Sequence, residues 1–461
     1  MDRKRVKIDS EFQPKKRAKR CHGDDDRISQ LPDDILVIIL SFLSLTEAAR
    51  TSVLSSRWIN LWKHTSSLNF DAESALQKIA EPEVVEKKYE LLEMERPKYI
   101  KWVKRVLQSH KAPTLKEFRI CFALSRSNRN AITRWLKFAF ARKVERLELD
   151  LDGELLMLSR PYENYTFPEE LLTRSIGAAS IDFKSLRALS LKFVNVSGEA
   201  VEFFLRNCPL LEKLVVRGTE KISNLEVCGP SLMLKHLELC NCYHIKSIMI
   251  SAPNLTSLSV SILKGLVLVN VPMLVELSVS NGIDPIKYLI PALACCISQL
   301  EILALQLHNP LENKEDYKFP ELPKLKKLVI NYGVARRDES LIQLTPLIRA
   351  SPYLEEFVFQ VCLFYHIGSD REFENTLSFP HQHLKMFKFC GYYGGTSDFE
   401  LVRYILENCV ALEKMIIDPH YQLWGRVPLP RDKLDAEQTA RKYAEQQLKG
   451  KLPQHIELVI L

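Results

Sequence analysis

The chain has 461 residues, of which 46% are hydrophobic and 26% are charged. This balance is typical of a folded protein and excludes disordered and fibrous classes, while the length predicts several domains or one elongated repeat array. The formal net charge is +7, but residues 1–20 alone hold nine Lys or Arg against three acidic residues, a local balance of +6. The remaining body is near neutral, which argues against a basic nucleic-acid groove along it.

Residues 1–26 contain hardly any side chain suited to a core and are predicted to be a disordered basic tail. Its two basic groups resemble a bipartite nuclear-import signal, which an importin would read: Lys4, Arg5, Lys15, Lys16, Arg17, Lys19 and Arg20. We expect a nuclear or nucleocytoplasmic location, with a merely solubilising tail as the alternative. The 11 cysteines show no pairing rhythm, the polar N-terminus contains no apolar signal segment, and no apolar run reaches bilayer length. A reducing compartment and no membrane insertion are expected.

Residues 27–70 change to helical periodicity, with Pro32 suited to a first helical position. Apolar residues recur on one face from Ile35 to Leu43, yet Leu36, Val37 and Leu40 are apolar as well, so two faces need burial. Three short helices in so few residues are too small to enclose this surface. Either the rest of the chain or a partner protein must cover the excess.

The stretch DRISQLPDDILVIILSFLSLTEAARTSVLSSRWINLWKHT resembles a plant-type F-box in its Leu-Pro opening, its isoleucine-rich helix and its closing Leu-Trp. The resemblance implies docking to a Skp-type adaptor and, through it, to a cullin. It places the adaptor-binding positions at Leu31, Pro32, Ile35, Ile39, Leu43, Val53, Leu54, Trp58, Leu61 and Trp62. Some of these ten are expected to be internal core instead, and the sequence does not separate the two groups.

Residues 71–110 are predicted to be a helical coupling segment, with Pro97 as a breaker. Beyond them the pattern L-x-x-L-x-L, with conservative replacements, returns twelve times, which is the leucine-rich-repeat signature. The repeats begin at Leu115, Val144, Leu186, Leu211, Leu234, Leu255, Leu274, Leu300, Leu325, Leu354, Leu384 and Leu412. Each hexad is one short strand that buries its leucines only when its neighbours stack on it, so a solenoid follows.

Two further stretches resemble the same plant proteins: CPLLEKLVVRGTEKISNLEVCGPSL their repeats, and HLKMFKFCGYYGGTSDFELVRYILENCVALEKMIID the FBD module that often ends them. The predicted fold class is therefore an α/β repeat solenoid, in which a three-helix F-box precedes a leucine-rich-repeat horseshoe. We assign residues 111–379 to the repeats and 380–461 to FBD-like terminal repeats and a cap, closed by a strand in HIELVIL.

No motif for bond chemistry is present. There is no C-x-x-C, phosphate-cradling glycine loop or H-E-x-x-H. Cys240, Cys242, Cys295 and Cys296 are interpreted as buried core thiols, and His366, His381 and His383 lack further ligands at suitable spacing. We predict no catalytic residues, no metal and no cofactor, and hence a protein that is not an enzyme.

Recognition is expected on the outward residues of the strands. They carry charges of both signs, which suits a protein target better than nucleic acid. The target-binding candidates are Arg146, Glu148, Lys213, Arg217, His236, Glu238, Lys327 and Glu356, each of which is alternatively a solvated surface residue. The resulting hypothesis is the substrate-recognition subunit of a Skp-cullin-F-box ubiquitin ligase. A ligand-sensing F-box co-receptor and a nuclear scaffold without ligase role are the alternatives.

Overall fold

The fold was analysed in a computed structural model of the chain. It describes residues 28, 30–80, 84–152, 164–173, 183–229, 232–261, 263–280, 289–291, 294–307, 319–334, 341–363, 379–420, 431–450 and 452–461. These fall into two compact units, one ending at Thr65 and the other running from Ser66 to Leu461. Each unit is described by itself.

The described residues of the first unit form two short α-helices and two 3-10 helices: α1 (Asp33–Leu40), α2 (Leu45–Arg50), η1 (Thr51–Val53) and η2 (Leu61–His64). Ser44 begins α2 through a capping box, in which its hydroxyl accepts from the Glu47 amide and the Glu47 carboxylate accepts from the Ser44 amide. The third helix predicted from the sequence is the 3-10 helix η2 in the structure. The core of the first unit is small and consists of Leu36, Leu40, Ala48, Trp58 and Leu61.

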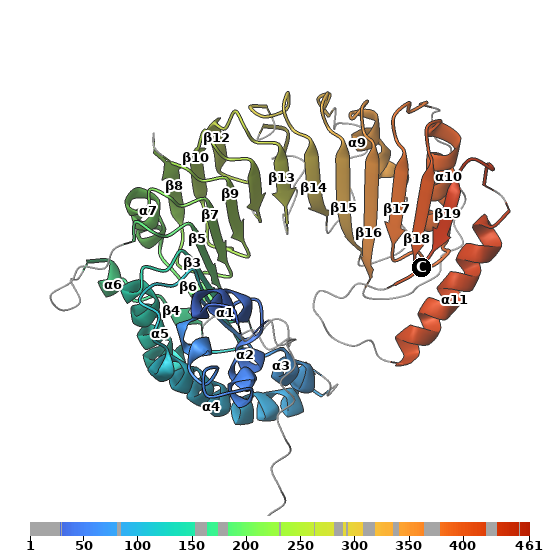
Figure 1. Ribbon diagram of the computed structural model, residues 1–461. Helices are drawn as coiled ribbons and strands as arrows, with labels where there is room; N and C mark the ends of the chain where they lie inside the picture. Colours follow the sequence, from blue (N-terminus) through green and yellow to red (C-terminus); the bar gives the residue numbers. More distant parts are fainter. Residues whose placement is uncertain are drawn as a thin grey trace, which may run out of the picture. The chain divides into compact units, whose positions relative to one another are not determined.

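The second unit is built on one sheet of 14 parallel strands, in which each strand pairs with the next one along the solenoid (Figure 1). The strands are β1 (Ser67–Asp71), β2 (Glu117–Cys121), β3 (Arg146–Asp150), β5 (Ala188–Lys192), β7 (Lys213–Arg217), β9 (His236–Cys240), β11 (Ser257–Val260), β13 (Glu276–Val279), β14 (Ile302–Leu307), β15 (Lys327–Val334), β16 (Glu356–Leu363), β17 (Met386–Cys390), β18 (Lys414–Asp418) and β19 (Glu457–Ile460). All twelve predicted repeat positions are buried, which confirms the register of the hexads.

Helices and a second sheet cover the outer side of this arc, and the strands line its inner side (Figure 1). The helices are α3 (Glu73–Ala80), α4 (Val85–Ser109), η3 (Arg126–Asn128), α5 (Arg129–Ala141), α6 (Glu170–Thr173), α7 (Gly198–Asn207), η6 (Leu341–Leu344), α9 (Thr345–Arg349), α10 (Thr396–Asn408) and α11 (Arg431–Leu448). Between β7 and β13 the helices give way to a three-stranded parallel sheet of β8 (Asn224–Cys228), β10 (Ser247–Ser251) and β12 (Leu266–Asn270). A further pair joins β4 (Tyr165–Thr166) to β6 (Val194–Asn195).

The segment 71–110 is helical as predicted, in α3 and α4, and it connects the strands β1 and β2 of the main sheet, but Pro97 does not break it. β1 already pairs with β2, and α4 continues through Pro97 as one helix of 25 residues. Contacts on both sides of the proline hold the helix in place: Arg96 Nε donates to the carbonyl of Ala123 at 3.0 Å, and the Tyr99 ring stacks on Phe122 with ring centres 4.4 Å apart. Tertiary packing here outweighs the lost backbone hydrogen bond.

The sheet continues without a break across residue 380, because β17 pairs with β16 and β19 with β18. The predicted closing strand is β19. Within the described part of the chain, no helix is both long and apolar enough to cross a bilayer.

Candidate functional site

The first unit displays a large apolar face. Ile35, Ile38 and Ile39 on α1 and Phe42 and Leu43 just after it are 40% to 83% exposed, whereas Leu36 and Leu40 on the opposite side of α1 are at most 1% exposed. The periodic stripe noticed in the sequence is therefore the outer face, and the additional apolar residues form the core. Val53, Leu54 and Ile59 of the same unit are also exposed, at 87%, 65% and 47%. We call these eight residues the F-box apolar face.

The structure separates the ten predicted adaptor-binding residues into three groups. Pro32, Ile35, Ile39, Leu43, Val53 and Leu54 are exposed, Trp58 and Leu61 belong to the core, and Leu31 and Trp62 pack partly buried against that core. Ile38, Phe42 and Ile59 were missing from the predicted set. The i, i+3, i+4, i+7 spacing contained the signal for Ile38 and Phe42, whereas nothing in the sequence distinguished Ile59.

A polar clamp holds the segment after α2 against the start of α1. Arg57 Nε donates to the carboxylate of Asp33 at 2.7 Å, and the same guanidinium donates to the carbonyl of Leu31. These charge-assisted hydrogen bonds link two segments 24 residues apart in the sequence.

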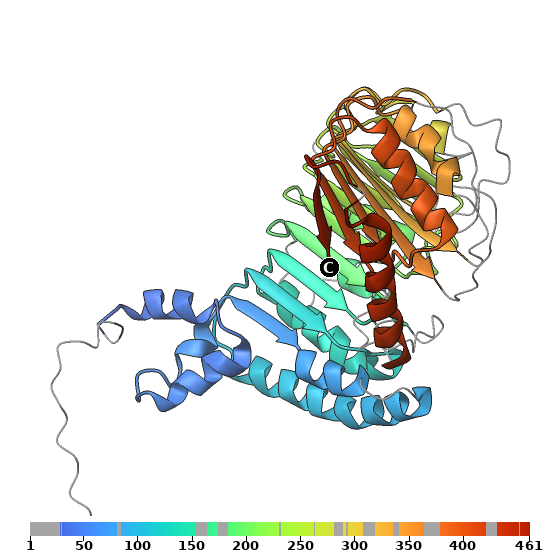
Figure 2. The same cartoon turned by 90° about the vertical axis from the view of Figure 1, so that its right-hand side faces the viewer.

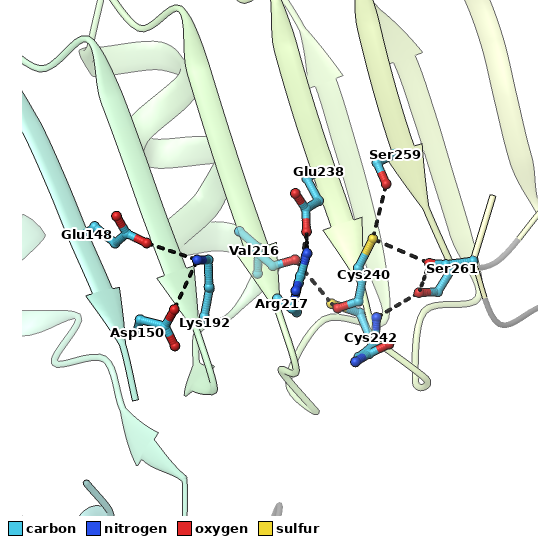
Figure 3. A network of polar contacts seen from close by, with 12 residues as sticks. Glu148, Asp150, Lys192, Val216, Arg217, Glu238, Cys240, Cys242, Ser259 and Ser261 are labelled. Atoms are coloured by element: carbon cyan, nitrogen blue, oxygen red, sulfur yellow. Dashed lines mark hydrogen bonds and ion pairs between the residues drawn. The ribbon is translucent and has the colours of Figure 1, made fainter. Parts of the chain in front are cut away.

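The inner face of the second unit is made of outward-pointing strand residues in two unlike halves. From β1 to β9 most of these side chains are charged, and they form a chain of ion pairs across neighbouring strands. Arg119 lies 3.3 Å from Asp71 and 3.1 Å from Glu148, and Lys192 lies 2.9 Å from Glu148 and 3.0 Å from Asp150. Arg217 Nε donates to Glu238 at 2.9 Å (Figure 3).

This pairing changes how the predicted target-binding residues are interpreted. Glu148, Arg217, Glu238, Lys327 and Glu356 all have intramolecular ionic partners, the last two forming a 2.8 Å pair with each other. Arg146 lies 3.8 Å from Glu117, and His236 Nδ1 lies 3.2 Å from the Ser257 hydroxyl. Lys213 is exposed. The structure thus brings the first six together on β3, β7 and β9 and places Lys327 and Glu356 on β15 and β16.

Burial and neighbouring charges set the titration of this network. Burial alone would lower the pKa of Lys192, but the carboxylates of Asp150 and Glu148 reverse that effect and raise it. The same balance raises the pKa of Arg217 beside Glu238. These cations are held charged and paired, so a ligand that used them would first have to displace an internal carboxylate.

In the other half of the inner face one row of side chains is apolar, flanked by charged or amide residues such as Lys327, Glu356 and Asn331, and we call it the apolar half for this row. Ala304, Val329 and Val358 occupy equivalent positions on β14, β15 and β16, and Ile416 and Val459 continue the row beyond Lys388. All are only partly buried. The predicted target-binding residues do not include this apolar row, because only charged residues and one histidine were selected. The apolar residues at the same hexad positions were nevertheless present in the sequence.

We next consider where the cysteine and histidine side chains of the described residues lie. Cys240, Cys242 and Cys296 are buried as predicted, whereas Cys295 is exposed. Burial raises the pKa of the Cys121, Cys208, Cys242, Cys296 and Cys409 thiols to about 12, so these are protonated at neutral pH. No group of three or more His, Cys, Asp or Glu among the described residues could hold a metal ion. His366 and the seven predicted import residues lie outside the described ranges.

Comparisons with known proteins agree with these two units. Residues 28–69 match the F-box domain family, and residues 106–461 match the leucine-rich-repeat domain family of At1g61320/AtMIF1. The FBD-associated F-box protein At3g52670 of Arabidopsis thaliana is 31% identical over 62% of this chain and 68% of its own length. From the same organism, the putative F-box/FBD/LRR-repeat protein At4g13965 is 31% identical over 74% of this chain and 76% of its own. The putative FBD-associated F-box protein At5g56440 is 26% identical over 85% and 92%.

Proposed function

The chain belongs to the plant family of F-box/FBD/LRR-repeat proteins, and on this premise we propose that it is the substrate-recognition subunit of a Skp-cullin-F-box ubiquitin ligase. The F-box apolar face carries the proposal. It exposes eight large apolar side chains on a unit whose own core holds five residues. Apolar patches of this kind mark protein interaction sites, and in this family the F-box is the domain that docks a Skp-type adaptor.

The second unit would then hold the protein to be modified. Its inner face offers apolar contacts from β14 to β16 and a self-paired charged region from β1 to β9. We infer that the apolar half supplies most of the affinity, because burying unpaired apolar surface has no competing internal partner. When the first unit binds the adaptor and the second binds the target, the target is held close to the ubiquitin-charged enzyme on the cullin. Its effective concentration there is raised.

Two finer assignments belong to the same proposal. We propose that residues 380–461 form an FBD-type cap, supported by the relatives' names and by β19 ending the sheet. We also propose that the basic residues between Lys4 and Arg20 direct nuclear import through an importin. A fluorescent fusion in which Lys15, Lys16, Arg17, Lys19 and Arg20 are all replaced by Ser should then lose its nuclear accumulation.

The groove on the inner face gives the ligand-sensing alternative little support. This groove of about 260 Å³ lies on the charged half, and its cations Arg146, Lys192, Lys213 and Arg217 share it with the carboxylates of Glu117, Glu148 and Glu238. A small anionic ligand would have to compete with these carboxylates, which already pair with Lys192 and Arg217.

The test is capture of partners by the full chain with the proteasome inhibited. We expect the adaptor and cullin with the natural protein, and loss of both with Phe42→Asp combined with Val53→Asp. The matched control is Val410→Asp in the second unit, since Val410 is also apolar and is 58% exposed. Retention of adaptor and cullin by the double variant would refute the ligase proposal.

A further inference from the structure

Positive charge is concentrated in the first repeats of the second unit. Between Lys98 and Lys143 the sequence has thirteen Lys or Arg and one acidic residue, Glu117, a net charge of +12. Averaging over the body hid this feature, because acidic residues elsewhere cancel it in the total. The segment contains the second half of α4, the strand β2 and all of α5.

The helical part of this charge is not neutralised within the molecule. Lys98 pairs with Glu95 at 2.8 Å, but Lys101, Lys104, Arg134 and Lys137 are exposed and make no ion pair with any residue that the structure describes. On the sheet, by contrast, most cations have a carboxylate on the neighbouring strand. The two helices therefore present a basic surface that has no internal counterpart.

An apolar groove of about 270 Å³ runs between α4 and α5 on this surface. Ile100 and Leu107 from α4 and Trp135 and Phe138 from α5 line it, and the only charged residues of its lining are Lys104 and Arg134. Both helices lie on the outer side of the sheet, away from the inner face described above (Figures 1 and 2). A basic rim around an apolar floor is thus built into the outer layer.

The shape and charge of the groove identify the class of its occupant. A groove between two helices accepts apolar side chains spaced at i, i+3, i+4 and i+7 on a partner helix, and a basic rim selects carboxylates flanking that stripe. Nucleic acid would require exposed aromatic planes for base stacking, but Trp135 is 3% exposed and forms the floor. Phosphates would leave the apolar floor unfilled.

We propose that the groove between α4 and α5, with Lys104 and Arg134 on its rim, docks an acidic amphipathic helix of a partner protein. The site is distinct from the F-box apolar face and from the inner face of the sheet. A partner bound here leaves the inner face of the sheet free, so the second unit can hold it together with a target. The proposal does not depend on ligase function.

The test uses the full chain and a labelled helical peptide with Leu at i, i+3, i+4 and i+7 and Glu at the remaining positions. Fluorescence anisotropy should show binding that weakens at least about tenfold in Lys104→Glu combined with Arg134→Glu, since like charges would then face each other. Leu107→Asn should also weaken it. The matched control, Lys442→Glu with Lys449→Glu, reverses two exposed lysines elsewhere and should leave the Kd unchanged.

Two comparisons make the outcome decisive. The basic tail is present in every variant, so differences in Kd between variants report on the groove. Peptide binding should also slow hydrogen exchange of the backbone amides in residues 98–111 and 129–141. A peptide with Ser in place of Leu should bind at least about tenfold more weakly. The proposal is overturned if the double reversal leaves the Kd within about twofold of the natural value. Equal binding of single-stranded RNA, with the same loss on reversal, would show a general polyanion surface and overturn it as well.

Discussion

Leu36 and Phe42 show what a single residue does and does not reveal in the sequence. Both are large and apolar and both follow the helical start at Pro32, yet Leu36 is fully buried and Phe42 is 83% exposed. The sequence predicts that two faces of this segment need covering, because it contains more apolar residues than a small unit can enclose. It cannot decide which face turns inward, since that depends on where Trp58 and Leu61 fold back against α1.

His381 illustrates the same limit for a titratable group. The sequence analysis judged that His366, His381 and His383 lack the further ligands that a metal site needs, but it could not predict that backbone groups contact both ring nitrogens of His381. Nε2 lies 2.8 Å from the Ser351 carbonyl, and Nδ1 accepts from the Leu384 amide at 3.1 Å. Both bonds are satisfied by the neutral ring with its proton on Nε2.

This environment predicts an acid-sensitive stability. Burial lowers the pKa of His381, so the folded protein keeps the ring neutral while the unfolded chain protonates it near pH 6.5. The stability from this group is present above that pH and is lost on acidification, by at most about 1.4 kcal/mol for each pH unit. His381→Gln should lose less free energy of unfolding than the natural chain between pH 7.5 and 5, measured by urea titration. His244→Gln, at an exposed position in another repeat, should keep the natural pH dependence, and equal slopes for all three proteins would contradict the account.

At the scale of elements, hydrophobic periodicity predicted every strand of the main sheet except β1. The hexads predicted twelve strands of the main sheet and HIELVIL predicted the last one, because each leucine position must enter a shared core. β1 was missed, since SLNFD alternates Leu68 and Phe70 without a leading apolar hexad position. The continuity of α4 through Pro97 was also missed, because local propensity cannot register contacts such as that between Tyr99 and Phe122.

Gly265 lies in the turn before β12 and predicts how sensitive the outer three-stranded sheet is. Its φ is +79°, and an added Cβ would lie 2.1 Å from the carbonyl oxygen of Lys246. Gly450, after α11, has a similar φ of +81° but open space around it. Gly450→Ala should therefore lower the free energy of unfolding by about 1 kcal/mol, and Gly265→Ala by about 1 to 3 kcal/mol more. Thermal denaturation followed by circular dichroism compares them, and an equal loss would show that the backbone clash is relieved without cost.

For the whole molecule, the different chemistry of the two halves of the inner face leads to a prediction about target binding. If the apolar half of the inner face provides the affinity, Val329→Lys with Val358→Lys should abolish capture of ubiquitinated target proteins by the full chain while adaptor binding is unchanged. Ser190→Lys, at the equivalent position on β5 in the charged half, should have a smaller effect. Quantitative mass spectrometry of captured proteins measures both. The reverse order of effects would assign target binding to the charged half.

The most direct test of the account is calorimetric titration of the full chain with a purified Skp-type adaptor at several temperatures. We predict one-to-one binding with a negative heat-capacity change, because the F-box apolar face leaves water. Phe42→Asp should weaken this binding by at least about 30-fold, as expected for an interface hot spot, whereas Val410→Asp should not change it. Absence of binding by the natural chain, or the same Kd with Phe42→Asp, would contradict the claim that this face is the adaptor site.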